Sequence, residues 1–239
     1  MRDQYAGDLS DVLKFSFLRA LVGTDRNLGI AWYYVPGDDG RADGRHLEWR
    51  REPAWQVLDA KLHAGLSSLP ERSIAAMELA DIWPLATTFF REPVALGQLR
   101  DAWGERMREA LATSDVLFLD SDNGVGSKTP KHATLEEIRS LRKPGRSVVF
   151  ISFPGRNMPH DDLLRRLHER LRIDGGSTSV VTLRTSVSLP RGDGSPFLVQ
   201  RQRWFTVVDA TDELIRRVRG FASGLAGIPR VGARIDGGK

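Results

Sequence analysis

The sequence predicts one α/β domain with a Rossmann-like, mostly parallel sheet that ends in a C-terminal antiparallel hairpin. Two observations predict this fold. Short apolar strands alternate with amphipathic helices through much of the chain, which is typical of parallel strands joined by helical crossovers. Two longer alternating segments, 179–189 and 197–208, then flank the Gly-rich sequence "PRGDGSP", as in an antiparallel hairpin.

The first elements follow from the spacing of apolar residues. Apolar side chains at helical intervals predict a helix over about 9–22, with Asp8 or Ser10 as its cap. The segment "LGIAWYYVP" (28–36) is rich in β-branched and aromatic residues and ends in Pro-Gly, which predicts a strand. The same criteria predict a helix over 54–66 and a weaker strand over 86–90. Residues 71–80 are predicted to be helical, with a short strand over "SIAAMELA" as the alternative.

The alternation is clearest in the second half of the chain. It predicts helices over 96–113, 133–142, 160–172 and 211–221, and strands over 115–120 and 147–153. The residues after the last helix are rich in glycine and lack a periodic apolar pattern, so we expect a loose tail over 223–239. The domain is therefore predicted to span residues 1–222.

Composition limits the classes of protein and site. The chain has 239 residues, 41% of them hydrophobic and 28% charged, which suits one globular core. It has no cysteine, which excludes disulfides, zinc–thiolate sites and cysteine nucleophiles. A formal net charge of +4 permits nucleic-acid binding without establishing it. We find no apolar run of about 20 residues and no secretory signal, and expect a cytoplasmic protein without a membrane partner.

Two acidic loops follow predicted strands. In an open α/β sheet, ligands bind beyond the carboxyl ends of the strands, and loops 36–46 and 120–124 both begin there. If the two strands are neighbours, the loops face each other across one cleft. Carboxylates brought together raise one another's pKa or require a cation. The alternative is that both are ordinary Asp/Gly turns. The candidate residues are Asp38, Asp39, Asp43 and His46 in the first loop and Asp120, Asp122 and Asn123 in the second.

The N-terminal sequence "YAGDLSDVLK" is a third candidate. Gly7 precedes the predicted helix and can offer free N–H groups to an anionic ligand. Lys14, one turn further on, can reach a phosphate or a carboxylate. The structural alternative is that Asp8 caps the helix and that Asp11 and Lys14 form an i,i+3 pair on its surface.

Three arginines are candidates for nucleic-acid binding. Arg156 follows the strand 147–153 and can close the cleft or hold a phosphate. Arg201 and Arg203 share one face of the last predicted strand. With the arginines of the last helix they predict a basic patch whose nucleic-acid affinity falls steeply with salt.

The opening sequence resembles a known signature. "YAGDLSDVLK" is similar to the His-Ala-Gly-Asn-x-Ala-Asp-Val-Leu-Lys motif that opens bacterial ribosomal-RNA adenine-N6 methyltransferases, and "LDSDNG" stands where that family has Asp-Pro-Pro-Tyr. A parallel sheet finished by a hairpin is also the order expected of class I S-adenosylmethionine-dependent methyltransferases. The chain also resembles an uncharacterised bacterial family, through "QYAGD", "DGRH" and "DSDNG".

The resemblance implies roles for individual residues. Asp120 matches the leading acid, which accepts hydrogen bonds from the exocyclic amine of the base. The matches to the opening signature are Gly7, Asp8, Asp11 and Lys14. The chain departs from the family at Tyr5, where the family has histidine, at Ser121 and Asp122, which replace two prolines, and at Asn123, which replaces the aromatic stacking residue.

These observations lead to one expectation and two alternatives. We expect an S-adenosylmethionine-dependent, methyltransferase-like protein that acts on RNA, DNA or a nucleotide. Its expected catalytic residues are Lys14, His46, Asp120, Asp122 and Asn123, and its cofactor-binding residues are Gly7, Asp8, Asp11, Gly37, Asp38, Asp39 and Asp43. The first alternative is a hydrolase or nuclease whose Mg²⁺ or Mn²⁺ is held by Asp38, Asp39, Asp43, Asp120 and Asp122. The second is a non-catalytic nucleic-acid- or protein-binding module on a degenerate methyltransferase fold.

Overall fold

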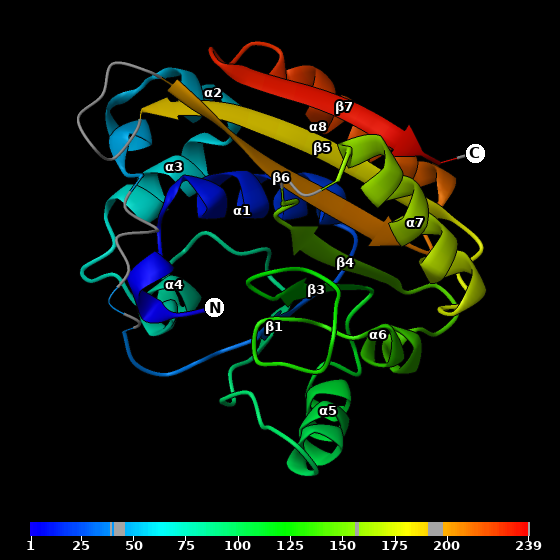
Figure 1. The fold of residues 1–239 in the computed structure, drawn as a ribbon. Coiled ribbons are helices and arrows are strands. Elements are labelled where there is room, and N and C mark those ends of the chain that lie inside the picture. The colour runs from blue at the N-terminus through cyan, green and yellow to red at the C-terminus, as the bar shows by residue number, and fades with distance from the viewer. Residues whose placement is uncertain (39, 41–45, 156–157, 191–197, 239) are drawn as a thin grey trace.

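The computed structural model describes residues 1–38, 40, 46–155, 158–190 and 198–238. The strands of this part of the chain form a seven-stranded sheet in the order β2-β1-β3-β4-β6-β5-β7 (Figure 1). The strands are β1 (Leu28–Trp32), β2 (Thr87–Phe90), β3 (Val116–Asp120), β4 (Ser147–Ser152), β5 (Val180–Pro190), β6 (Leu198–Val208) and β7 (Val231–Gly237).

Helices cover both faces of the sheet. The α-helices are α1 (Leu9–Val22), α2 (Ala54–Leu58), α3 (Ala60–Ser67), α4 (Ile74–Leu79), α5 (Leu99–Ala110), α6 (Leu135–Leu141), α7 (His160–Ile173) and α8 (Asp212–Leu225), with 3-10 turns at Asp3–Tyr5 and Glu48–Arg51. Strand β1 is buried throughout because its alternating side chains enter two cores: Ile30 packs with α1, α3 and α8, and Ala31 packs with α5 and α6. None of the described helices is long and apolar enough to cross a membrane.

The strand directions confirm the coarse prediction of a mixed α/β sheet. Strands β2, β1, β3 and β4 run parallel to their neighbours, and β6 runs antiparallel to β4. Strand β5 is antiparallel to β6 and therefore points the same way as β4. The two strands that precede the acidic loops are direct neighbours, with Trp32 of β1 opposite Asp120 of β3. Both loops therefore start from the same edge of the sheet.

Two element predictions are wrong. The predicted helix 54–66 is divided into α2 and α3 by Asp59, whose φ of −160° and ψ of 98° are extended and whose side chain caps α3 by accepting from the Leu62 N–H. The predicted loose tail contains β7, which pairs antiparallel with β5, and α8 continues to Leu225. Arg184 of β5 also holds Asp236 of β7, with 2.8 Å between Nε and Oδ2.

The long hairpin of β5 and β6 extends past the end of β4. Only residues 204–208 of β6 pair with β4, and the pairing ends where Ser152 lies opposite Trp204. Residues 198–203 continue beyond that point and pair with β5 alone. This overhanging part of β6 stands at the carboxyl ends of the parallel strands. Its side chains can therefore form one wall of a ligand site at that edge of the sheet.

Candidate functional site

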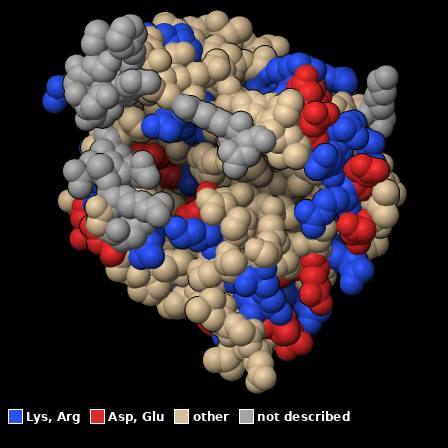
Figure 2. Space-filling view, viewed as in Figure 1, with Lys and Arg blue, Asp and Glu red and all other residues tan. Residues whose placement is uncertain are grey.

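A cleft of about 800 Å³ lies at this edge of the sheet. The start of α1, the residues after β3, the residues after β4 and the overhang of β6 line it. Figure 2 shows the hollow on the left of the face, with acidic atoms in its depth and basic side chains beside it. The volume falls within the roughly 300–1,000 Å³ of sites for small molecules. The predicted site residues that line it are Asp8, Asp11, Lys14, His46, Asp120, Asp122, Asn123, Arg201 and Arg203.

The floor of the cleft is a buried ionic triad. Lys14 Nζ lies 2.6 Å from Asp11 Oδ1 and 2.9 and 3.0 Å from the two carboxylate oxygens of Asp120. The three residues are at most 3% exposed. One helical turn brings Asp11 and Lys14 to the same side of α1, and β3 delivers Asp120 at its last residue. The opening motif and the strand-end motif, 106 residues apart in the chain, therefore meet.

Burial and mutual charge set the protonation of this triad. Burial raises the pKa of Asp11 to about 7; Lys14 opposes this rise, and the charges of Asp8 and Asp120 add to it. Burial alone would lower the pKa of Lys14, but the carboxylates of Asp11 and Asp120 together raise it above its ordinary value. Lys14 therefore keeps its charge at neutral pH, whereas Asp11 titrates near it.

At the start of α1, side chains of the same segment already accept hydrogen bonds from backbone N–H groups. The Asp8 carboxylate accepts from the backbone N–H groups of Ser10 and Asp11, at 2.7 and 3.3 Å. Gly7, with φ of +71°, donates its N–H to Asp11 Oδ2 at 2.7 Å. The prediction that Gly7 offers a free N–H to an anionic ligand is therefore wrong. Asp8 does line the cleft, as does His46, whose carbonyl accepts from the Leu9 N–H at 3.1 Å.

The loop after β3 folds back on itself and presents Asp122 and Asn123. The Asn123 N–H donates to the Lys131 carbonyl at 2.8 Å, and the Ala133 N–H donates to the Gly124 carbonyl at 2.9 Å. Asp122 Oδ1 lies 3.0 Å from the amino group of Met1. Both predicted residues, with Lys131, line the cleft.

Gly124 lets this loop pack against β4. Its φ is +78°, and a Cβ at this position would lie 2.3 Å from Ser152 Oγ and 3.0 Å from the Ile151 carbonyl oxygen. We expect Gly124→Ala to lower the free energy of unfolding by about 1–3 kcal/mol, from backbone strain and crowding together. Gly145→Ala is the matched control, because Gly145 has φ of +80° but open space around it. Urea denaturation measures both; equal losses would contradict a packing role for Gly124.

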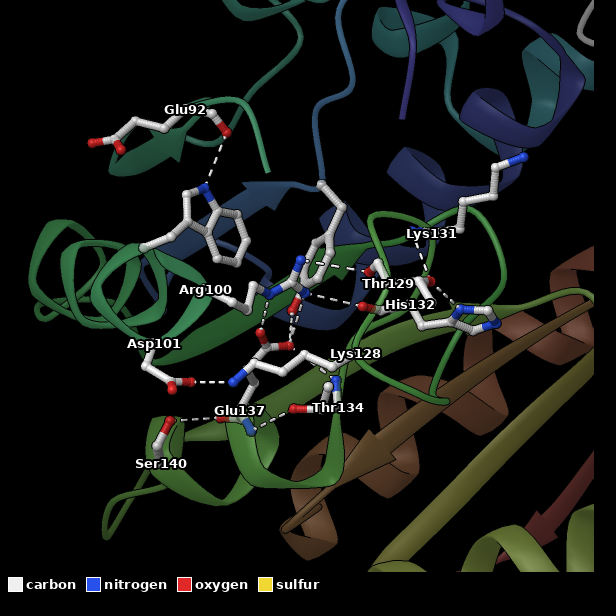
Figure 3. Close-up of polar contacts among 12 residues, drawn as sticks. Glu92, Arg100, Asp101, Lys128, Thr129, Lys131, His132, Thr134, Glu137 and Ser140 are labelled. Carbon is white, nitrogen blue, oxygen red and sulfur yellow. Dashed lines mark hydrogen bonds and ion pairs between the residues drawn. The ribbon is translucent and has the colours of Figure 1, made fainter. Parts of the chain in front are cut away.

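Arg100 holds the same loop from the other side, and the sequence analysis missed it. Figure 3 shows its side chain between Glu137 and the loop. Arg100 Nε donates to Glu137 Oε1 at 2.6 Å, and Nη2 donates to the His132 carbonyl at 3.1 Å. Glu137 also accepts from the Tyr33 hydroxyl at 2.9 Å and caps α6 through the Thr134 N–H. In the sequence, Thr134 and Glu137 have the spacing of a capping box, which could have identified Glu137 as a structural residue. Arg100 is distant in the chain, and no local pattern indicates that it pairs with Glu137.

The first acidic loop contributes less than predicted. Asp38 is exposed, accepts from the Gly40 N–H at 2.8 Å and is not among the residues that line the cleft. The carbonyl of Gly37 accepts from Arg2 at 2.8 Å. Asp39 and Asp43 lie outside the described residues. The described residues contain no group of three His, Cys, Asp or Glu side chains suited to a metal ion, so they give the metal-dependent alternative no support.

The predicted basic residues separate into different settings. Arg201 is exposed, whereas Arg203 is only 4% exposed, and both line the cleft. Arg203 Nε donates to Ser10 Oγ at 2.8 Å, which joins the β6 wall to the start of α1. Arg217 of α8 instead forms an ion pair with Asp25, with 2.7 Å between Nη2 and Oδ1. Arg156 lies outside the described residues. Arg203 is therefore a component of the cleft wall and not part of an exposed patch.

Comparisons with known proteins show a shared fold. The chain matches no protein-family model, and no curated protein matches it. A crystal structure of a Legionella pneumophila protein assigned to DUF519 has a TM-score of 0.51 and 11% identity over 98% of each chain. A precorrin-8w decarboxylase from Methanobacterium thermoautotrophicum has 12% identity over 88% of this chain and all of its own, but its TM-score of 0.35 carries no argument. The first likeness extends over nearly the whole chain and concerns the fold alone.

Proposed function

We propose that this chain is an S-adenosylmethionine-dependent, methyltransferase-like protein that acts on a nucleic acid or a nucleotide. The observation that carries the proposal is the contact between Lys14 and Asp120 at the floor of the cleft. These residues come from the two motifs on which the resemblance to adenine-N6 methyltransferases rests. The order of parallel strands followed by a hairpin agrees with a class I methyltransferase-type sheet.

The side chains around the cleft fit such a cofactor. S-adenosylmethionine supplies an activated methyl group on a positively charged sulfur and carries a carboxylate on its amino-acid end. Asp8 and Asp122 line the cleft and favour positive charge. Arg203, on the β6 wall of the cleft, has an Nη1 with no hydrogen-bond partner among the described residues, which suits the carboxylate.

Asp120 is suited to orient an amine. Each of its carboxylate oxygens receives one hydrogen bond from Lys14, and a carboxylate has about four acceptor positions. The remaining positions can accept from the amino group of a base, and the negative charge stabilises the positive charge that develops on nitrogen as it is methylated. Lys14 holds the carboxylate in one orientation.

Phe153 offers the stacking surface that Asn123 lacks. It follows β4 at the same sheet edge, lines the cleft and is 39% exposed. Stacking of a base on an aromatic ring is worth about 1–3 kcal/mol. A base held by Asp120 can therefore lie against Phe153, so loss of the aromatic residue from the strand-end motif does not by itself remove base binding.

We expect S-adenosylmethionine to bind in isothermal titration calorimetry and methyl transfer to appear with a radiolabelled donor and bacterial RNA or nucleotides. Asp120→Asn is expected to lower transfer by about 100-fold or more while changing cofactor affinity much less, because Asp120 serves the acceptor amine. Asp101→Asn, in an exposed ion pair outside the cleft, is the matched control.

The outcomes separate the remaining functions. No heat at millimolar S-adenosylmethionine or S-adenosylhomocysteine would contradict the proposal. Cofactor or RNA binding without transfer, equal in Asp120→Asn and the parent protein, would favour the non-catalytic alternative.

A further inference from the structure

Arg203 is a buried cation without an anionic partner in the part of the chain that the structure describes. It is 4% exposed, and its Nε donates to the neutral Ser10 hydroxyl at 2.8 Å. Its Nη1 is buried and has no hydrogen-bond partner among the described residues, and no described carboxylate is hydrogen-bonded to its guanidinium. A guanidinium keeps its charge in proteins, so an arginine cannot relieve its burial by losing a proton. Buried charges are normally paired.

The surroundings of Arg203 leave its charge uncompensated at close range. Burial lowers the pKa of Arg203; Asp8 opposes this effect from a distance, Arg201 adds to it, and Asp11 opposes it weakly. The Asp8 carboxylate caps α1, where it accepts from the N–H groups of Ser10 and Asp11. The Asp11 carboxylate is held by Lys14 and by the Gly7 N–H.

The position of Arg203 directs this charge to the cleft. Arg203 lies in the part of β6 that extends beyond β4 and pairs with β5, and it lines the cleft together with Arg201. Ser10 at the start of α1 fixes its Nε side. A bound anion would therefore meet a guanidinium that is already oriented and desolvated, which strengthens a charge-assisted hydrogen bond.

We propose that Arg203 binds an oxyanion group of the ligand, a carboxylate or a phosphate, at the β6 wall of the cleft. Such a group supplies the oxygen acceptors that Nη1 lacks, and a planar guanidinium can bind either group through two parallel hydrogen bonds. The inference deepens the proposed function, since it takes the same cleft as the ligand site. It adds that the ligand extends from the acidic residues at the floor of the cleft to Arg203 on the β6 wall. Two sources share this chemistry: the amino-acid end of the cofactor and the phosphate of a nucleotide.

Two pairs of compounds test the proposal by calorimetry on the full chain. S-adenosylhomocysteine and 5′-methylthioadenosine differ in the carboxylate-bearing amino-acid end, and adenosine monophosphate and adenosine differ in the phosphate. We expect the anion-bearing member of at least one pair to bind the parent protein about 10-fold or more tightly. Arg203→Gln is expected to abolish that preference, and Arg203→Lys to retain part of it. Arg216→Gln, at an exposed position on α8, is the matched control.

The two arms distinguish this inference from the proposed function. A preference for adenosine monophosphate over adenosine that depends on Arg203, with no binding of S-adenosylhomocysteine, would support the oxyanion site and contradict the cofactor. Equal affinity for S-adenosylhomocysteine and 5′-methylthioadenosine, unchanged in Arg203→Gln, would support cofactor binding. It would also show that Arg203 does not bind the carboxylate of the cofactor. Absence of any Arg203-dependent preference in both pairs, including absence of binding, overturns the inference. If Arg203→Gln fails to fold, Arg203→Lys decides: a preference for the anion-bearing compound that is unchanged in Arg203→Lys, or absent from the parent protein, overturns the inference.

Discussion

Replacing Lys14 with methionine is expected to lower the free energy of unfolding by about 3–5 kcal/mol. Methionine fills much of the volume of the lysine stem but removes the ammonium that both Asp11 and Asp120 contact. Two buried carboxylates would then face each other without a cation, and each must either stay ionised at a high desolvation cost or take up a proton. Equilibrium unfolding in urea at pH 7 and at pH 5 measures the loss, which we expect to be smaller at the lower pH.

The control for Lys14→Met is Lys128→Met. Lys128 also pairs with an aspartate, Asp101, but both side chains are exposed, so its loss should cost less than about 1 kcal/mol. The double variant Lys14→Met with Asp120→Asn should recover part of the stability, because one of the two orphaned charges is gone. A Lys14→Met variant within 1 kcal/mol of the parent protein would contradict the view that this ion triad is held together by its lysine.

The general geometry of parallel sheets predicted that loops 36–46 and 120–124 face one cleft; of the described residues of the first loop, His46 lines it and Asp38 does not. Asp120 was a candidate because acids at the exit of a buried strand are costly, and Lys14 because it follows a helix start in a recognisable signature. The register of β1 against β3 puts Trp32 opposite Asp120, so both loops start at one edge of the sheet, but it does not place Lys14, which lies on α1. Register depends on packing between strands that are far apart in sequence, so the sequence could indicate neighbours but not the ion pair itself.

Other parts of the site depend on contacts that no local pattern reveals. Arg203 looked like half of an exposed pair with Arg201, because alternation along a strand does not tell where the neighbouring strand stops. Its burial follows from the end of β4 at Ser152 and from the approach of Ser10. Strand β7 was missed for a related reason: four of the seven residues of "VGARIDG" are exposed, and the strand is held by backbone pairing with β5 and not by an apolar pattern.

Replacing Arg100 with methionine is the other change with a large expected effect, again about 3–5 kcal/mol, because it leaves Glu137 buried without its cation. Unlike Lys14, Arg100 lies outside the cleft-lining residues, and its guanidinium also donates to the carbonyl groups of Thr129 and His132 in the loop that presents Asp122 and Asn123. We therefore expect a second effect: faster hydrogen exchange at the amides of Asn123 and Ala133, which bridge that loop.

The matched control for Arg100→Met is Arg106→Met on the same helix, where the pair with Glu92 is exposed and should cost less than about 1 kcal/mol. Arg100→Lys tests the geometry of the guanidinium, since an ammonium keeps the charge near Glu137 but cannot reach both the carboxylate and the loop carbonyls. If Arg100→Met lost stability while exchange at Asn123 and Ala133 stayed unchanged, Arg100 would support the core under α5 and α6 without positioning the loop. Faster hydrogen exchange in Arg100→Lys as well would show that charge alone does not hold the loop. The hydrogen bonds of the guanidinium to Glu137 and to the loop carbonyl groups would then position Asp122 and Asn123 at the cleft.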